Sequence, residues 1–85
     1  MISIKELKTK AMGLEPIINV GKAGLTDSII EEIKSQLKNR KLIKVKFLKS
    51  ALKDKDKKEL AEELVSKTNA QLIHKVGFVV VLYKK

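Results

Sequence analysis

The chain contains no cysteine, so neither a disulfide bond nor a metal site with thiolate ligands can stabilise its fold. Histidine occurs once, as His74, and a lone histidine does not supply the ligand set of a zinc site. The serines lie outside any Gly-x-Ser-x-Gly elbow that would expose a nucleophile. We therefore predict a protein that is not an enzyme and that holds no metal and no other cofactor.

Aromatic residues and long apolar runs are also scarce. The aromatic residues are Phe47, Phe78 and Tyr83, and they do not form the signature of an RNA-recognition motif, so we expect base stacking to be minor. The longest apolar run, residues 78–83, is far shorter than the roughly 20 residues that cross a bilayer. The N-terminal segment alternates apolar and charged residues, unlike a signal peptide. We expect a cytoplasmic protein without a membrane partner.

Acidic residues are the minority charge. Ten Asp and Glu stand against 19 Lys and Arg, which leaves a formal net charge of +9 on 85 residues. Such an excess attracts polyanions, of which nucleic acid is the commonest. A chain of this length buries only roughly 60–65% of its unfolded surface, but 44% hydrophobic residues suffice for a small core. Without repeats or linkers in the sequence, we predict a single domain, residues 1–85.

Hydrophobic periodicity predicts three helices and four strands in the order α-β-α-β-α-β-β, an α/β (α+β) fold. The expected elements are a short helix ending at Gly13, a strand at 17–20 after Pro16, a helix from Asp27 to Asn39 capped by Thr26 or Asp27, a strand at 42–48, a helix between Asp54 and Asn69 as caps, a strand at 72–76, and a strand at 78–83 after a turn at Gly77. The last strand is apolar throughout and should be central. The second and third helices should cover one sheet face, and the first helix part of the other.

A glycine loop, Gly21-Lys22-Ala23-Gly24, joins the first strand to the second helix. Amide N–H groups and the macrodipole at a helix start favour an anion, and glycines leave room for phosphate oxygens. Lys22 would add a full positive charge. The spacing matches neither a Walker loop nor the dinucleotide fingerprint, so an enzyme that uses nucleotides is not indicated. We interpret the loop as a phosphate cradle, with a plain turn as the alternative.

A second group of cations surrounds the strand at 42–48. Ile43, Val45 and Phe47 share one face of this strand, while Lys44 and Lys46 lie on the other. Together with Arg40 and Lys41, which end the preceding helix, these lysines could follow a phosphate backbone. The alternative is that they only keep an exposed strand soluble and unpaired.

The charged segment 54–67 is interpreted as a solvated helix surface. Oppositely charged residues recur there at i,i+4, as Asp54/Lys58, Lys55/Glu59, Lys58/Glu62 and Glu63/Lys67. Such pairs stabilise a helix by about 0.2–0.5 kcal/mol each. The acidic residues would also repel a phosphate backbone, so this segment is not expected to bind RNA.

Four segments together resemble the CRM domain, named for chloroplast RNA splicing and ribosome maturation, in its stand-alone prokaryotic form. They are the helix-then-proline entry at Pro16, VGKAGLT at 20–26, LIKVKF at 42–47 and VGFVVVLYK at 76–84. The resemblance spans nearly the whole chain. These ordered segments are far more specific than Gly-x-x-Gly alone.

The resemblance implies a four-stranded mixed sheet, similar to the C-terminal domain of bacterial translation initiation factor 3. It also implies RNA binding through the glycine loop and a neighbouring basic surface. By position, the family's loop maps onto Gly21, Lys22, Ala23 and Gly24, with Leu25 and Thr26 completing the motif. Lys84 stands where many members have arginine after the tyrosine, which keeps the charge but loses a bidentate phosphate donor.

We therefore predict a monomeric RNA-binding protein that recognises structured RNA, namely ribosomal RNA during assembly of the large subunit. The glycine loop would hold a phosphate, and Arg40, Lys41, Lys44 and Lys46 would extend the contact. One alternative is a nucleic-acid-coating chromatin protein of the Alba kind, and another is a ribosome-associated adaptor that binds a second protein. The sequence leaves open whether Lys44 and Lys46 share a face with the loop.

Overall fold

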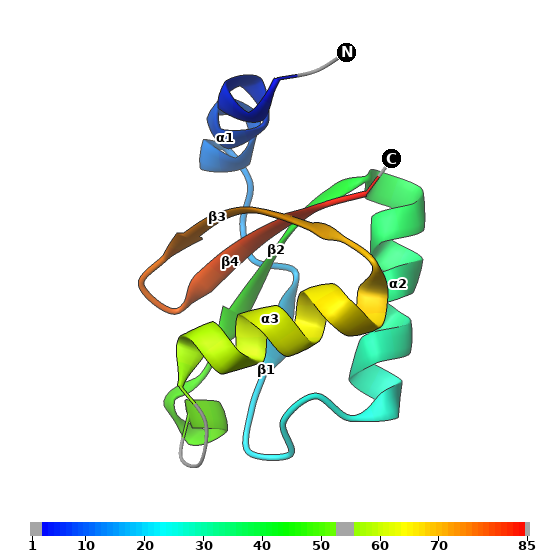
Figure 1. The fold of residues 1–85 in the computed structure, drawn as a ribbon, viewed down its shortest axis with the longest axis vertical. Coiled ribbons are helices and arrows are strands. Elements are labelled where there is room, and N and C mark those ends of the chain that lie inside the picture. The colour runs from blue at the N-terminus through cyan, green and yellow to red at the C-terminus, as the bar shows by residue number, and fades with distance from the viewer. Residues whose placement is uncertain (1–2, 53–55, 85) are drawn as a thin grey trace.

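The computed structural model describes residues 3–52 and 56–84, and its elements follow the predicted α-β-α-β-α-β-β order (Figure 1). They are α1 (Ile4–Met12), β1 (Ile18–Val20), α2 (Asp27–Arg40), β2 (Leu42–Phe47), the short 3-10 helix η1 (Lys49–Leu52), α3 (Lys57–Thr68), β3 (Gln71–Val76) and β4 (Val79–Tyr83). The strands form one sheet in the order β1-β2-β4-β3, with β1 parallel to β2 and the other neighbours antiparallel. The predicted four-stranded mixed sheet is thus confirmed, and β4 is central.

Local sequence signals fix both ends of α1 and the start of α2. Gly13 is the C-cap of α1, as predicted. Thr26 is the N-cap of α2, and its hydroxyl accepts a hydrogen bond from the Ile29 amide at 3.2 Å. A threonine hydroxyl suits this position because it satisfies an amide that has no carbonyl partner within the helix. The helix α2 extends one residue beyond the predicted end, to Arg40.

The caps of α3 agree with the prediction at one end only. Asn69 ends the helix in the left-handed conformation, with φ 57° and ψ 26°, as predicted. The start was wrong: Asp56 is the N-cap, and its carboxylate accepts from the Glu59 amide at 2.8 Å. Asp54, the predicted cap, lies outside the described residues. Two aspartates precede the helix in the sequence, and the local pattern does not say which one the first turn uses.

Four predicted strand boundaries differ from the structure, and two of these differences are small: β2 ends at Phe47 rather than Leu48, and β3 begins at Gln71 rather than Leu72. The first strand begins at Ile18 rather than Ile17, whose amide nevertheless donates to the Lys44 carbonyl at 3.1 Å. The last strand begins at Val79 because Gly77 and Phe78 form the turn between β3 and β4. Gly77 has a φ of +56°, which a two-residue hairpin turn requires and glycine readily adopts. The apolar character of Phe78 therefore belongs to an exposed turn residue, not to the central strand.

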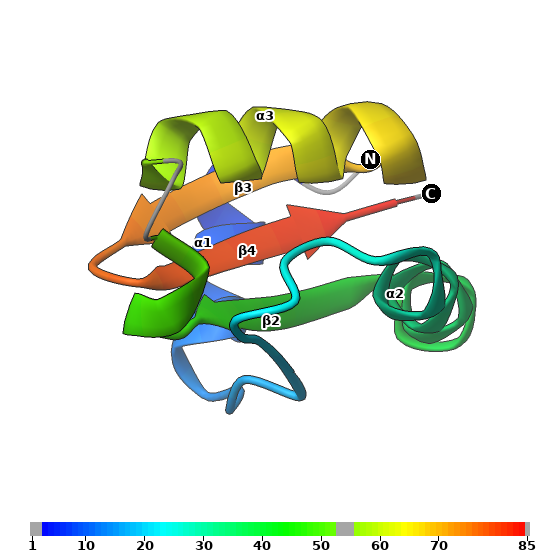
Figure 2. The same ribbon diagram turned by 90° about the horizontal axis from the view of Figure 1, so that it is seen from below.

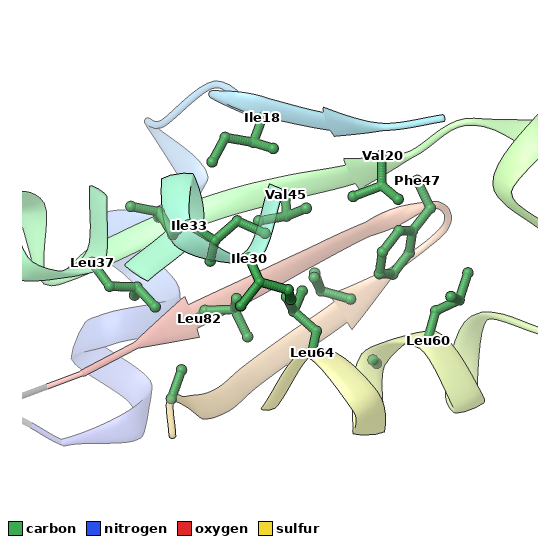
Figure 3. Packing of buried hydrophobic residues seen from close by; sticks show 14 of the residues in the cluster. Ile18, Val20, Ile30, Ile33, Leu37, Val45, Phe47, Leu60, Leu64 and Leu82 are labelled. Carbon is green, nitrogen blue, oxygen red and sulfur yellow. The ribbon is translucent and has the colours of Figure 1, made fainter. Parts of the chain in front are cut away.

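The main core lies between the sheet and two helices, α2 and α3 (Figure 3). The periodicity of α2 predicts one apolar stripe of Ile29, Ile30, Ile33 and Leu37; the last three are buried, and Ile29 is partly buried against the core. Leu64 of α3 and Phe47 of β2 are also fully buried. Figure 2, in which α2 is seen nearly end-on, shows both helices beside the sheet. This packing holds β1, α2 and β2 in a fixed arrangement, which positions the loop between β1 and α2.

The helix α1 covers part of the opposite sheet face, as predicted. Its buried residues are Leu7 and Ala11, which pack against Ile73 of β3 and Val81 of β4. Ile4 and Met12 remain 51% and 82% exposed. This second layer is therefore small, and much of the α1-facing surface stays accessible.

Candidate nucleic-acid interface

The glycine loop forms a tight turn directly after β1, at the end of the molecule opposite the C-terminal end of β4 (Figure 1). The Gly24 amide donates to the Gly21 carbonyl at 2.9 Å, and Gly24 has a φ of +72°. An L residue rarely adopts this conformation, so the turn requires the second glycine. A Cβ atom at Gly21 would meet only Leu48 at 3.6 Å and Ser50 at 3.9 Å, so the first glycine is not required sterically.

The next two residues of the motif anchor the loop. Leu25 is partly buried and packs against the main core. Thr26 caps α2 through the bond described above. Lys22 and Ala23 are exposed between these fixed points. The six-residue motif thus combines residues that shape the turn with a short exposed tip, and the tip is the part that can contact a ligand.

Backbone amides at this tip are available to an anion. Within residues 3–52 and 56–84, the amides of Lys22, Ala23 and Leu25 donate no hydrogen bond to the protein. The Gly24 amide is already engaged in the turn, so it cannot be one of the donors that the sequence suggested. The N-terminal end of α2 adds partial positive charge, while Asp27 in its first turn adds a competing negative charge. An anion is therefore best placed at the Lys22 side of the loop.

The segment at the start of η1, outside the predicted site, lies beside the first glycine of the loop. The side chains of Leu48, before η1, and Ser50, within it, carry the atoms that a Cβ at Gly21 would meet. Lys49, between them in the sequence, is exposed. No local pattern links Lys49 or Ser50 to the loop, because the two segments meet only through the parallel pairing of Val20 with Phe47.

Arg40 and Lys41 lie far from the glycine loop. Arg40 is the last residue of α2 and Lys41 is its C-cap, and the 14 residues of this helix span about 21 Å at 1.5 Å per residue. Figure 1 shows this end of α2 near the C-terminal end of the chain, opposite the loop. Both residues line a cleft with Lys10 of α1 and Tyr83 of β4. The structure thus divides the predicted site into separate regions.

The strand lysines belong to the sheet face that α1 partly covers. Ile43, Val45 and Phe47 point into the main core, so Lys44 and Lys46 point the other way. The loop instead leads into α2, on the core side. Lys44 lines a groove of about 520 Å³ beneath α1 with, among others, Lys8, Pro16, His74 and Val79. The exposed Lys46 is in register with Asn19, two residues before the loop, and is the strand lysine nearer to it.

Lys84 has contacts within the protein. Its ammonium donates to the Thr68 carbonyl at 3.3 Å, at the C-terminal end of α3, where a cation is favoured by the helix dipole. Its amide donates to the Lys41 carbonyl at 2.9 Å. Lysine at this position therefore has a structural role, whether or not it also touches a ligand.

The charges are unevenly distributed over the elements. The helix α3 with its cap carries three lysines and four acidic residues, 3 − 4 = −1, whereas α1 carries three lysines and Glu6, 3 − 1 = +2. The four strands carry Lys44, Lys46 and Lys75 and no acidic residue. Ion pairs along the helices, Lys67 with Glu63 at 3.1 Å and Lys34 with Glu31 at 3.5 Å, neutralise part of the charge on α3 and α2. Among the helices and strands, the basic excess therefore lies on α1 and on the strands rather than on α3.

Metal binding and membrane insertion have no structural support in the described ranges. No group of three or more His, Asp or Glu side chains there could hold a metal ion. None of the helices traced in 3–52 and 56–84 has both the length and the apolar character that crossing a bilayer requires.

The model of the CRS1/YhbY (CRM) domain family matches residues 3–84. The chain is 45% identical over 78 residues to a probable RNA-binding protein of Methanocaldococcus jannaschii, covering 92% of this chain and 58% of the relative. It is 42% identical over 79 residues to one of Bacillus subtilis, covering 93% and 80%. A solution structure of a Staphylococcus aureus protein, described as an RNA-binding candidate, matches with a TM-score of 0.77 and 36% identity over 100% of this chain and 90% of the other.

The two glycines of the loop should differ when each is replaced by alanine. Gly24→Ala is expected to lower the free energy of unfolding by about 1–2 kcal/mol, because φ is positive there. Gly21→Ala should leave it unchanged or raise it by up to about 1 kcal/mol, because alanine restricts the unfolded chain. Urea denaturation followed by circular dichroism measures both. Equal losses in the two variants would contradict the assigned turn.

Proposed function

The chain belongs to the CRS1/YhbY (CRM) domain family, and from this premise we propose that it is an RNA-binding protein, not an enzyme. Residues 1–85 act as one binding domain and as a monomer, and structured RNA is the ligand. The names of the relatives, probable RNA-binding proteins, support RNA as the partner. Family membership also favours this proposal over an Alba-like coating protein. A ribosome-associated adaptor is the remaining alternative.

The observation that carries the proposal is the exposed tip Lys22-Ala23, held between a fixed turn and the N-terminal end of α2. In the proposed mechanism the amides of Lys22 and Ala23 donate to a phosphate oxygen and the Lys22 ammonium neutralises its charge. The turn, Leu25 and the Thr26 cap keep these amides in place before RNA arrives. Little conformational entropy is then lost on binding.

The neighbouring cations extend the contact in two directions. Lys46 is in register with Asn19, two residues before the loop, and the exposed Lys49 begins η1, directly after β2 and Leu48. Lys44 lies farther along β2, on the α1 side. Arg40 and Lys41 lie at the end of α2 opposite the loop, and the helix between them is about 21 Å long, so an RNA that contacts both regions must span at least the length of this helix. Lys84 contributes charge at that far end. We propose that one RNA follows this basic side, with the acidic α3 outside the interface.

We further propose that the target is ribosomal RNA in a precursor of the large subunit, in the cytoplasm. The family resemblance supports this target, since stand-alone bacterial members associate with such precursors. Crosslinking in cells followed by sequencing of the bound RNA should recover precursor ribosomal RNA as the main species. Recovery of mature tRNA or messenger RNA without it would overturn the assembly role while leaving RNA binding intact.

A matched pair of variants isolates the charge at the loop. Asparagine and aspartate both tolerate positive φ better than other side chains, so Gly24→Asn and Gly24→Asp share the same backbone cost. The space beside Gly24 is open, because a Cβ atom added there would have no heavy atom within 4 Å. Because its carboxylate would repel a phosphate at the tip, Gly24→Asp should bind RNA at least about tenfold more weakly than Gly24→Asn, or about 1.4 kcal/mol. Gel-shift titration measures the ratio, and equal affinities would refute phosphate binding by the loop.

Salt dependence tests the electrostatic mechanism and the adaptor alternative. The logarithm of affinity should fall linearly with the logarithm of salt concentration, and Lys22→Gln should reduce that slope by about 1. Lys67→Gln is the control, since it removes the same charge from a lysine already paired with Glu63. If ribosome association proves insensitive to salt and to replacement of Lys22, Lys44 and Lys46, the adaptor alternative is supported instead.

A further inference from the structure

A cleft of about 740 Å³ opens between α1, the end of α2 and the paired ends of β2 and β4. Its apolar part is formed by Leu7, Leu14 and Leu42 together with the side chain of Tyr83. Leu14 is 39% exposed, and Tyr83 is partly buried on the small cluster beneath α1. Small-molecule pockets typically measure about 300–1,000 Å³ and combine an apolar lining with a few polar groups. The cleft is thus large enough for a planar ring and offers an aromatic surface.

Three cations complete the lining of this cleft: Lys10, Arg40 and Lys41. The Arg40 guanidinium is oriented by a hydrogen bond from its Nε to Gln36 Oε1 at 3.0 Å. None of the described residues that line the cleft is acidic. The ligand that complements this lining carries negative charge beside a flat apolar group.

The backbone of Lys41 is held firmly at the edge of the cleft. Its φ is +68°, an uncommon value for a residue other than glycine. Its amide donates to the Leu37 carbonyl at 2.8 Å, and its carbonyl accepts from the Lys84 amide at 2.9 Å. These bonds hold the turn from α2 into β2, and so fix where the Lys41 side chain leaves the backbone.

We propose that this cleft binds an unpaired nucleotide of single-stranded RNA, with the base against Tyr83 and the adjacent phosphates against Arg40, Lys41 and Lys10. The inference rests on the proposed RNA-binding function and adds a base contact at the end of α2 opposite the glycine loop, with its own ligand class. Unpaired bases can stack on aromatic side chains, whereas bases inside a duplex present only their edges. An acidic peptide would satisfy the cations but leaves the accessible aromatic surface unexplained.

Intrinsic fluorescence reports on this contact directly. The chain has one tyrosine, Tyr83, and no tryptophan, so tyrosine emission comes from this lining residue alone. Single-stranded oligouridine should quench this emission saturably, after correction for absorbance with free N-acetyltyrosinamide. An abasic oligomer of the same length keeps the phosphates but lacks bases, and it should bind more weakly with no quenching. A fully paired RNA duplex should likewise leave the emission unchanged.

Substitutions at the two aromatics outside the main core provide matched binding measurements. Tyr83→Leu should weaken binding of oligouridine by about fivefold or more, the lower end of what loss of one stacked base costs. Tyr83→Phe should bind within about twofold of the wild type, because the ring is retained. Phe78→Leu is the control: this aromatic lies in the β3–β4 turn under the Lys57 ammonium, outside the cleft lining. It should bind normally.

The outcomes separate this inference from the proposed function. If Gly24→Asp loses RNA binding but Tyr83→Leu binds normally and oligouridine does not quench the tyrosine, the cleft proposal is wrong and RNA binding by the loop stands. Equal saturable quenching by polyglutamate would mean that the cleft accepts acidic chains rather than bases. If Tyr83→Leu fails to fold, the wild-type comparison of oligouridine with the abasic oligomer decides, and equal quenching by the two or no quenching by either would overturn the cleft proposal. Absence of any RNA binding by the wild type would overturn both proposals.

Discussion

The parallel alignment of β1 with β2 is the constraint on which the rest of the molecule depends. Parallel neighbours cannot be joined by a tight turn, so the chain must cross the sheet between them, and α2 makes that crossing. The crossing places the glycine loop at one end of α2 and Arg40 at the other. The burial of Ile30, Ile33 and Leu37 holds the helix in this path. The separation of the two candidate contact regions is therefore a consequence of strand direction.

The same constraint explains why so few residues of the glycine loop are left to contact a ligand. A chain that leaves β1 and enters α2 must turn within six residues, and most of those residues serve the turn itself. Gly24 supplies the positive φ, Leu25 anchors the loop on the core, and Thr26 caps the helix. Only Lys22 and Ala23 are left to face a ligand. A motif that looks like a ligand site in sequence is thus largely a folding device with a small exposed tip.

Local features of the fold could be predicted from the sequence, and relations between distant segments could not. The α2 cap, the Asn69 C-cap and the apolar stripe of α2 depend on residues a few positions apart, and all three predictions are confirmed. Phe78 was wrongly assigned to the last strand because it continues the apolar run of that strand in the sequence. Only the hairpin geometry at Gly77 shows that Phe78 belongs to the turn.

The spatial relation between the predicted site residues could not be derived from the sequence, for a related reason. Arg40, Lys41 and Lys44 are neighbours in sequence, but Lys41 ends the helix and Lys44 points from the α1 side of the sheet. Whether these residues lie near the loop depends on the length of α2 and on which sheet face each strand residue points to, and both are properties of the tertiary structure.

The scarcity of aromatic residues in the sequence had argued against base stacking. That argument considered only how many aromatic residues the chain has. The cleft depends on where an aromatic residue lies, since one tyrosine between cations is enough to stack one base. Under the two proposals, the loop binds a phosphate of either paired or unpaired RNA, whereas the cleft binds only an unpaired base. Because the two contacts lie at opposite ends of α2, they would together favour RNA in which a single strand adjoins a structured region.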